Sequence, residues 1–293
     1  MSPDPAARPP IDRPAPDRPA PDRPALDRPA LDRQRLGGTG TGLVPDLRVE
    51  VVEELGSTHA EALRRARDGA PDGLVVVADH QTAGRGRLDR TWETPARTAV
   101  TFSMVLRPGV PVAQWPWLPL LTGYAVDKVL KAAGLDAGVK WPNDVLVGDR
   151  KVAGVLVERV ETPDGPTAVV GVGVNVAQTA DELPDPTPTG LVPTSVELEL
   201  GRPVDRTDVL VEVLHAVREA VDAWEMGGDA GLDRLRESYA AACVTVGRDV
   251  RVDLPDGAAL VGRAVGIDPT GRLVVDVDGD RRAVSAGDVV HVR

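Results

Sequence analysis

The chain has 293 residues, of which 42% are hydrophobic, and it carries a formal net charge of −11 at pH 7. This length predicts about two domains. Its 45 acidic residues against 34 basic ones argue against a broad nucleic-acid surface, which needs clustered Lys and Arg.

Targeting and redox signals are few. No apolar run approaches the roughly 20 residues of a membrane helix, and the N-terminus has no basic stub followed by an apolar core. The single cysteine, Cys243, excludes an internal disulfide and a cysteine-based metal cage. A cytoplasmic protein without a membrane segment is therefore the default expectation.

The first 36 residues have low complexity. From Ile11 a five-residue unit repeats as IDRPA, PDRPA, PDRPA, LDRPA and LDRQR. Such a Pro-rich, polar segment buries too little apolar surface to offset its conformational entropy, which predicts a disordered spacer that is dispensable for catalysis. A ligand for an SH3-type partner is the alternative. With the glycine-rich hinge Gly37–Gly42, this tail extends over residues 1–43, ahead of a main domain at 44–243.

The main domain begins with a strand, a helix and a second strand. Leu47–Glu54 has strand character, and Gly56-Ser57-Thr58 opens a helix in which Thr58 and Glu61 form a capping box and Gly69 follows the end. On this pattern alone, Ser57 and Thr58 are capping residues. The apolar run Gly73–Ala78 predicts a buried strand.

The next segment, Gln81–Trp92, reads Q-T-A-G-R-G-R-L-D-R-T-W and connects that strand to another at Thr98–Leu106, which is expected to have one wetter face. The loop concentrates positive charge in an acidic chain. Its glycines let the backbone turn sharply, and arginine forks between them suit a phosphate or a carboxylate. A solvated basic hairpin is an equally good interpretation of this segment alone.

The remainder of the main domain alternates helices with strands. A helix is expected over Leu118–Ala133, stopped by Gly134, and an antiparallel meander over Val139–Val176. Glycines inside those strands mark bulges or places where a ligand needs the backbone close. A Pro-rich loop at 177–193 is followed by expected helices at Asp208–Met226 and Asp229–Ala242.

From Thr245 short alternating runs are separated by P-D-G, D-P-T-G and D-G-D turns. They predict a small antiparallel barrel of SH3-like size, occupying residues 244–293. The chain as a whole is therefore expected to be α+β, with a mixed or antiparallel sheet and flanking helices in the main domain.

Several of these segments, in this order, resemble biotin–protein ligases, also called biotin–[acetyl-CoA-carboxylase] ligases. The resemblance covers about residues 44 to 293 and rests on these motifs: Gly56-Ser57-Thr58, Gln81, G-R-G-R at 84–87, Trp92, K-W-P-N-D at 140–144, K-V-A-G-V-L-V-E at 151–158 and G-V-G-V-N-V at 171–176. It implies a class II synthetase-like catalytic domain. Because no DNA-binding domain is apparent, the chain looks like the monofunctional class.

Membership of that family would imply two steps. Biotin reacts with ATP to give biotinyl-5′-AMP and pyrophosphate, and the adenylate then acylates a lysine of a biotin carboxyl carrier domain. Arg87 and Lys151 match the residues placed between carboxylate and phosphate and are assigned the catalytic, electrostatic role. No metal site is expected in the protein, since Mg²⁺ arrives with ATP.

The resemblance also implies how the substrates are held. Residues assigned to biotin are Ser57, Thr58, His59, Gln81, Arg85, Gly86, Arg87, Trp92, Lys151 and Gly154. Residues assigned to ATP or the adenylate are Arg87, Arg90, Asn143, Lys151 and Asn175, the two asparagines reading adenine. Lys140 and Asp144 either help with Mg-ATP or hold the loop. A carrier domain of a carboxylase is the expected partner, a homodimer is possible, and nucleic acid is not expected.

The sequence departs from the family pattern at two places. His59 stands where asparagine is frequent, and Leu88-Asp89 replaces a second basic-glycine pair, which could loosen retention of the adenylate. Two alternatives stay open: a lipoate or octanoate ligase of the same fold, and a non-catalytic, biotin-sensing regulator. G-R-G-R and K-W-P-N-D favour biotin over lipoate, and the acidic body with its Pro-rich N-terminus disfavours a DNA-binding regulator.

Overall fold

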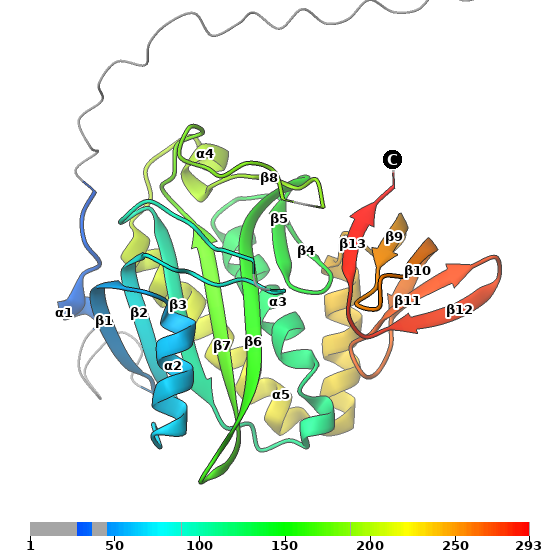
Figure 1. Cartoon of the computed structure of the whole chain (residues 1–293), viewed down its shortest axis with the longest axis horizontal. Helices are drawn as coiled ribbons and strands as arrows, with labels where there is room; N and C mark the ends of the chain where they lie inside the picture. Colours follow the sequence, from blue (N-terminus) through cyan, green and yellow to red (C-terminus); the bar gives the residue numbers. More distant parts are fainter. Residues whose placement is uncertain (1–27, 37–45, 89, 188, 293) are drawn as a thin grey trace, which may run out of the picture.

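A computed structural model of the chain describes residues 28–36, 46–88, 90–187 and 189–292. The main part contains, in chain order, α1 (Arg33–Leu36), β1 (Arg48–Leu55), α2 (Thr58–Arg67), β2 (Leu74–Gln81), β3 (Ala99–Leu106), a short 3₁₀ helix η1 (Val112–Gln114), α3 (Trp117–Ala132), β4 (Ala137–Lys140), β5 (Asp144–Val147), β6 (Arg150–Thr162), β7 (Gly165–Asn175), β8 (Val192–Pro193), α4 (Val196–Leu200) and α5 (Arg206–Ala242). The C-terminal part contains β9 (Asp249–Asp253), β10 (Ala259–Ile267), β11 (Leu273–Val277), β12 (Asp280–Val284) and β13 (Asp288–His291). The α+β class is confirmed (Figure 1).

The central feature is a mixed sheet in the order β1-β2-β3-β7-β6-β5-β4, with β8 paired to β6. Strands β1 and β2 are parallel, because helix α2 connects them, and the pairs from β2 through β7 to β4 are antiparallel. The predicted meander is β4 to β7, whose tight turns leave each strand beside the next (Figure 1).

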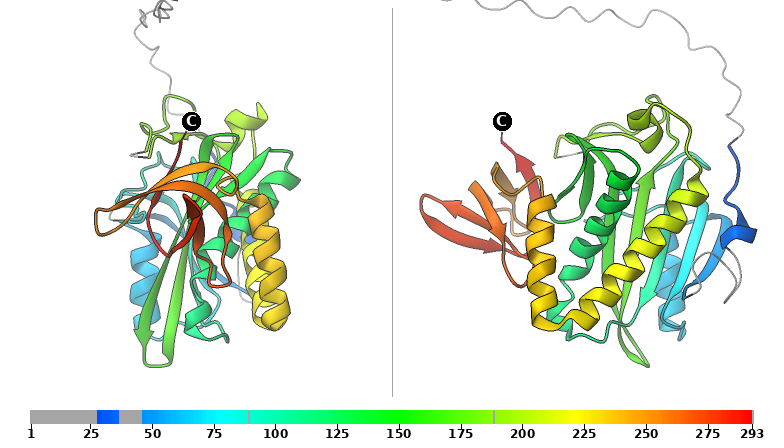
Figure 2. Two further views of the ribbon diagram at one scale, coloured as in Figure 1. Left: turned by 90° about the vertical axis from the view of Figure 1, so that its right-hand side faces the viewer. Right: turned by 180° about the vertical axis from the view of Figure 1, so that it is seen from behind.

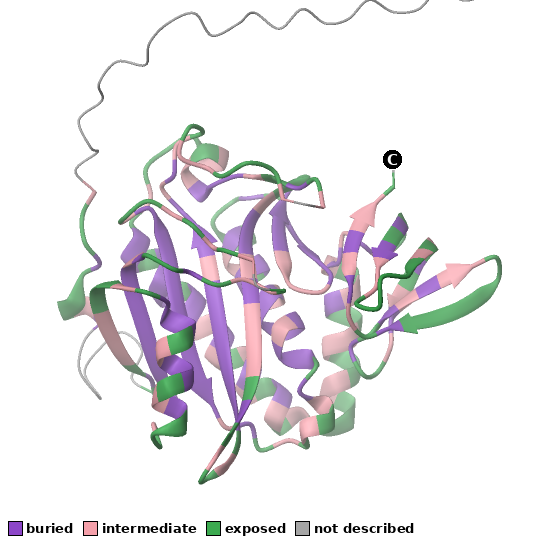
Figure 3. Cartoon of the chain, in the orientation of Figure 1, coloured by how far each residue is buried: buried purple, intermediate pink, exposed green. Residues whose placement is uncertain are grey.

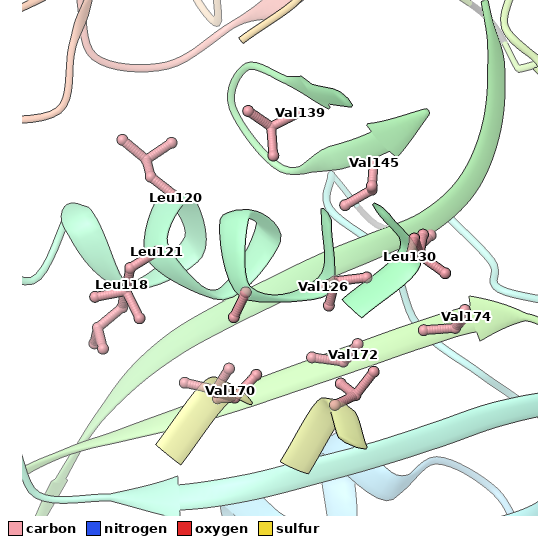
Figure 4. Packing of buried hydrophobic residues seen from close by; sticks show 14 of the residues in the cluster. Leu118, Leu120, Leu121, Val126, Leu130, Val139, Val145, Val170, Val172 and Val174 are labelled. Carbon is pink, nitrogen blue, oxygen red and sulfur yellow. The ribbon is translucent and has the colours of Figure 1, made fainter. Parts of the chain in front are cut away.

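Helices cover both faces of this sheet. Helices α3 and α5 pack together on one face, as the view from behind shows (Figure 2). Leu118, Leu121 and Val126 of α3 lie on the same side of the sheet as Val170 and Val172 of β7, in one hydrophobic cluster (Figure 4). Helix α2 covers part of the opposite face with Ala62, Leu63 and Ala66. As a result, β2 and β3 are buried along almost their whole length (Figure 3).

Two local predictions need correction. All eight residues of β3 are buried, so the strand has no face exposed to solvent. Its polar side chains form hydrogen bonds within the protein, Thr101 with the Ala78 carbonyl and Ser103 with the Thr58 hydroxyl. The cap of α2 is Ser57, whose side chain accepts from the Ala60 amide. Thr58 is not part of a capping box, because Glu61 pairs with Arg64 and Arg65 instead. Gly69 and Gly134 follow their helices with positive φ, as predicted.

The two helices predicted near the end of the main domain are joined in α5. The junction is Gly228, whose φ of 54° and ψ of −156° are non-helical and turn the chain between the two helical stretches. No described helix is long and apolar enough to cross a membrane.

The C-terminal part is a five-stranded antiparallel sheet in the order β12-β11-β10-β9-β13 (Figure 1). It is attached to the main part by two buried tryptophans. The indole Nε1 of Trp117 donates to the Pro269 carbonyl at 2.9 Å, and that of Trp141 donates to the Gly271 carbonyl at 3.0 Å. The small antiparallel domain expected from the turn pattern is therefore present and packed against the main one.

The N-terminal tail extends less far than predicted. Residues 28–36 pack on the main domain, where Leu31 and Leu36 are each only 3% exposed. The composition of the repeat obscured this, because two buried leucines can anchor a short segment when its backbone finds polar partners. The rest of the expected tail, 1–27 and 37–43, lies outside the described residues.

Candidate functional site

A cavity of about 510 Å³ is lined by residues of α2, of the central strands and of the segment that connects β2 to β3. That segment crosses in front of β7 and β6 on the sheet face that carries α2 (Figure 1). The size of the cavity is ordinary for a small-molecule site. Every site residue expected from the sequence lines it: Ser57, Thr58, His59, Gln81, Arg85, Gly86, Arg87, Arg90, Trp92, Asn143, Lys151, Gly154 and Asn175. Segments that are far apart in the chain therefore converge on one space.

One end of the cavity is lined mainly by neutral polar side chains. Gln81, at the end of β2, accepts from the Thr58 amide at 2.7 Å and from the Thr58 hydroxyl at 3.0 Å. The same hydroxyl lies 3.0 Å from Ser103 Oγ on β3. Because its oxygen is tied back to α2, Gln81 presents its amide N–H groups as donors. Buried neutral donors and acceptors of this kind fix the orientation of a polar, uncharged ligand group.

His59 lies at this end and is 3% exposed. Its Nε2 is 3.4 Å from a carboxylate oxygen of Glu158, but the two are not aligned as a hydrogen bond, and within the described residues neither ring nitrogen has a hydrogen-bond partner. Burial lowers the pKa of His59 below its ordinary value and outweighs the opposing effect of Glu158, so the imidazole is neutral at neutral pH. The neighbouring strand accommodates the ring only because position 171 is glycine: a Cβ there would lie 2.8 Å from His59 Nδ1.

Trp92 lies across β6 and β7 in the middle of the cavity. A Cβ at Gly173 would approach its indole to 2.6 Å, and one at Gly154 would approach to 3.3 Å. From the sequence, Gly154 was expected to leave room for a ligand. In the structure, Trp92 occupies the space next to it. The indole Nε1 of Trp92 is buried without a hydrogen-bond partner in the described part of the chain.

The 84–92 loop is a short hairpin. Its backbone closes through the Arg85–Thr91 bridge and a 2.9 Å hydrogen bond from the Trp92 amide to the Gly84 carbonyl. A side chain at position 84 would overlap the Trp92 carbonyl, so a glycine is required there. The hairpin thereby turns Trp92 inward and carries Arg85, Arg87 and Arg90 along the cavity wall.

Positive charge collects at the other end. Lys151 Nζ is 2.6 Å from Asp144 Oδ1 and 5.7 Å from the centroid of the Trp92 ring, which adds a cation–π contribution. Arg87 donates to Asn143 Oδ1 at 2.8 Å. Burial lowers the pKa of Arg87, an effect that Asp288 and Asp144 partly offset, and the guanidinium stays charged.

Lys140, undecided from sequence, is buried in the wall and donates to the Val289 carbonyl at 2.6 Å. Burial lowers its pKa, opposed by Asp144 and Asp288. In this conformation Lys140 joins the main domain to β13. Arg90 forms an ion pair with Asp288 of the same strand. The C-terminal sheet therefore supplies part of the cavity.

The two asparagines use their amides within the protein. Asn143 donates to the Val155 carbonyl at 3.0 Å, in addition to its bond from Arg87. Asn175 donates to the Thr194 carbonyl at 3.0 Å and accepts from Gln178 Nε2 at 3.0 Å. Each amide is thus held in a fixed orientation at the cavity wall, and it can still donate one further hydrogen bond and accept one more.

Sequence reasoning missed three parts of the wall. Ser103 could have been found, since Thr101 and Ser103 interrupt an apolar strand at alternate positions. The 177–193 loop was predicted, but not that its residues 184–187 face the cavity. Asp288 carried no signal at all, because nothing distinguishes it from the other acidic residues of the chain.

Comparisons with known proteins agree with this arrangement. Residues 55–175 match the model of the biotin/lipoate A/B protein ligase family, and residues 245–292 match that of the biotin protein ligase C terminal domain. A biotin–[acetyl-CoA-carboxylase] ligase from Mycobacterium tuberculosis is 41% identical over 252 residues, covering 84% of this chain and 90% of the relative. One of the same name from Paracoccus denitrificans is 33% identical, covering 80% of this chain and 96% of the relative.

The fold is also found among solved structures. The biotin protein ligase from Aquifex aeolicus in complex with biotin and ATP is similar with a TM-score of 0.71 and 26% sequence identity. The similarity covers 84% of this chain and 98% of that one.

Proposed function

Since this chain belongs to the biotin/lipoate A/B protein ligase family, we propose that its cavity joins biotin to AMP and passes the biotinyl group to a lysine of a carboxylase carrier domain. The observation that carries the proposal is the polarity of one cavity: neutral hydrogen-bonding groups around Gln81 at one end, cations around Lys151 and Arg87 at the other. Biotin has the same polarity, with a neutral ureido ring and a carboxylate tail.

The ureido ring is assigned to the neutral end, where Ser57, Thr58, His59 and Gln81 meet. Trp92 covers the tail that leads away from it. The tail points toward Lys151 and Arg87, so the carboxylate arrives between two cations. Partial burial matters here: a unit charge pair at 4 Å is worth about 1 kcal/mol in water and about 4 kcal/mol at an effective dielectric of 20.

In the first step a biotin carboxylate oxygen attacks the α-phosphorus of ATP. The bond from that phosphorus to the bridging oxygen breaks, and pyrophosphate leaves. Two anions must approach each other, and Arg87 and Lys151 stabilise the negative charge that accumulates between them. In the second step a carrier lysine, as the neutral amine, attacks the carbonyl carbon of the mixed anhydride. The amide forms, AMP leaves, and the amine proton is lost to solvent.

The nucleotide is assigned to the wall formed by Arg90, Asn143 and Asn175. An amide can bond the N6 and N7 edge of adenine, and the fixed orientation of both asparagines supports that role. Mg²⁺ is proposed to arrive with ATP and to neutralise phosphate charge. The described residues contain no cluster of three His, Cys, Asp or Glu side chains that could hold a metal ion.

The test is pyrophosphate exchange into ATP. We expect exchange that depends on biotin, is abolished by Lys151→Ala and is severely reduced by Arg87→Ala, because each removes a cation from the point where the anions meet. Lys128→Ala, at an exposed position of α3, is the matched control and should exchange normally. Exchange driven by lipoate in place of biotin would assign the chain to the other branch of the family.

Monofunctionality, a cytoplasmic location, a homodimer and the absence of nucleic-acid binding stay predictions. The carrier partner is proposed from the names of the two relatives, which specify acetyl-CoA carboxylase as the protein that they modify. Transfer of labelled biotin to a purified carrier domain, dependent on its acceptor lysine, tests that partner.

A further inference from the structure

The segment Arg28–Leu36, here called the N-terminal strap, is docked on the main domain. The residues that it contacts there are far from it in the sequence. Leu31 and Leu36 insert into the main hydrophobic cluster. Asp32 caps the turn between them by accepting from the Gln34 and Arg35 amides at 2.9 and 3.1 Å. The strap therefore has its own local structure and an apolar side that faces the protein.

The surface beneath the strap is built to receive a backbone. Asp79 of β2 and Arg206 of α5 form a buried ion pair with a 2.7 Å contact, their side chains 3% and 5% exposed. The ion pair binds both an acceptor and a donor of the strap's backbone. Arg206 donates to the Pro29 carbonyl at 2.8 Å, and Asp79 accepts from the Leu31 amide at 3.2 Å. The Asp32 amide donates to Thr207 at 3.1 Å. Buried backbone groups need such partners, so the match fixes the register of the strap.

Arg28 connects the strap to the loop at residues 177–187. Its guanidinium makes a bidentate pair with Glu182, at 3.0 and 2.7 Å, and donates to the Ala177 carbonyl at 3.2 Å. Burial alone would raise the pKa of Glu182, but hydrogen bonds from Arg28 and Thr179 outweigh it, and the pKa is lowered. Arg28 thus bonds two points of the 177–187 loop at once.

The same loop reaches the nucleotide end of the cavity. Its residues 184–187 line the wall, and Gln178 holds Asn175 through a 3.0 Å hydrogen bond. Arg28 therefore binds the loop at Ala177, which precedes Gln178, and at Glu182, two residues before the lining segment 184–187. A bidentate charged pair restricts both partners more than a single bond does.

We propose that the N-terminal strap is a positioning element of the cavity, with Arg28 as the residue that holds the 177–187 loop in place for the nucleotide. The kinetic part of this inference rests on the proposed function. Arg28 itself does not line the cavity, so it acts through the loop and not on a substrate. The inference replaces the expectation that the whole of residues 1–36 is dispensable.

The chain contains its own control. The pentapeptide R-P-A-L-D of the strap, residues 28–32, is preceded by an identical copy at 23–27. Arg28→Ala and Arg23→Ala therefore change the same residue in the same local sequence, and only Arg28 has described contacts with the loop. The two substitutions change the charge and composition of the tail equally, and neither changes its length.

The experiment measures full-length variants in two ways. In biotin-dependent pyrophosphate exchange, Arg28→Ala should raise the KM for ATP about tenfold, the effect of losing a charged hydrogen-bonded pair, with kcat and biotin affinity within about twofold. Arg28→Lys should recover part of the loss. Hydrogen exchange of the 177–187 amides, which needs no activity, should be faster in Arg28→Ala than in Arg23→Ala.

The two copies allow one complication, which the double variant resolves. In the Arg28→Ala variant, residues 23–27 could replace residues 28–32 on the main domain by a shift of five residues. Arg28→Ala alone would then change neither measurement, whereas Arg23→Ala/Arg28→Ala would change both, and this outcome would still support the docking. Silence of the double variant in both measurements overturns the proposal, and so does an equal loss in Arg23→Ala alone. If the wild type shows no biotin-dependent exchange, the proposed function fails, while hydrogen exchange still decides the role of the strap.

Discussion

Single glycines shape the cavity by leaving room for particular side chains. Gly171 lies against His59, and Gly173 lies against Trp92, each at a distance that a Cβ atom does not tolerate. These positions are on β7, where a glycine otherwise weakens a strand because it has no side chain to pack. Here the missing side chains are replaced by residues from α2 and from the 84–92 hairpin.

Gly173→Ala should therefore displace Trp92. The new Cβ would lie 2.6 Å from the indole, and overpacking of this kind costs about 1–3 kcal/mol. Because Trp92 lies on a loop that can move, we expect the cost to appear as weaker biotin binding, by about tenfold or more, rather than as lower stability. Calorimetric titration with biotin measures it. Gly109→Ala, with no atom within 4 Å of the added group, is the control; equal affinities in the two variants would contradict this account of Trp92.

His291 makes stability depend on pH. Burial, together with Lys140 and Arg248, lowers its pKa from 6.5 to about 4, with Asp149 opposing. Between those values the unfolded chain binds more protons than the folded one, so stability falls as pH decreases through this window. One pKa unit is worth about 1.4 kcal/mol, and with allowance for partial exposure we expect a loss of about 1–2 kcal/mol between pH 7 and pH 5.

Urea unfolding across that pH range, for the wild type and for His291→Gln, checks this expectation. The variant cannot be protonated and should show a shallower dependence. A residual slope is expected from His59, whose pKa is also lowered by burial. If the two pH profiles were parallel, His291 would not be the titrating group.

The ends of helices and strands were predicted correctly where residues close in the sequence determine them. Gly69 and Gly134 end α2 and α3 because a positive φ is cheap for glycine, and the turns of the meander lie between alternating apolar runs. The cap of α2 was misjudged because Thr58 bonds to Gln81, a partner 23 residues away. The strap was missed for the same reason, since the groups that bond its backbone, Asp79 and Arg206, are far away in the sequence.

Helix α5 contains a testable exception to helical geometry. Gly228, at φ 54° and ψ −156°, is in a region that is almost reserved for glycine. Gly228→Ala should destabilise the protein by about 1–3 kcal/mol. Gly227→Ala, next to it, meets no atom within 4 Å and has no positive φ, so it should be neutral or stabilising by up to about 1 kcal/mol. Neither residue lines the cavity, and exchange activity should be unchanged in both.

Urea midpoints of the two variants give the comparison. A Gly228→Ala variant as stable as Gly227→Ala would mean that the turn between the two halves of α5 is adjustable. In that case the conformation of Gly228 would not determine where the second half of α5 begins. This second half leads into the C-terminal sheet.

For the whole molecule, the candidate site could be predicted only in part. The motifs that carry the family resemblance, from Gly56-Ser57-Thr58 to G-V-G-V-N-V at 171–176, supplied site residues that all line one cavity, because each motif is a short continuous segment. The contribution of Asp288 and Val289 depends on how the second sheet packs, and no periodicity or spacing encodes that. The charge distribution is similar: a net charge of −11 gives no hint that Arg87, Lys140 and Lys151 converge in one place.

The two sheets should unfold together. Buried side chains of both sheets belong to one hydrophobic cluster, and the indole donors of Trp117 and Trp141 reach carbonyls of the 269–271 turn. Lys140 adds a third bond, to Val289. A small sheet held by buried bonds of this kind has little independent stability, so its opening requires loss of the main core.

Trp141→Phe tests this coupling. It keeps most of the aromatic packing but leaves the Gly271 carbonyl without its donor, which costs about 1–3 kcal/mol. We expect that cost to lower the free energy of exchange equally for amides in β9–β13 and in β2–β7, because both report one unfolding event. Native-state hydrogen exchange followed by peptide mass measures the two groups in the same sample. Should the amides of β9–β13 lose protection while those of β2–β7 keep theirs, the C-terminal sheet would be an independent unit and its part of the cavity wall would open separately.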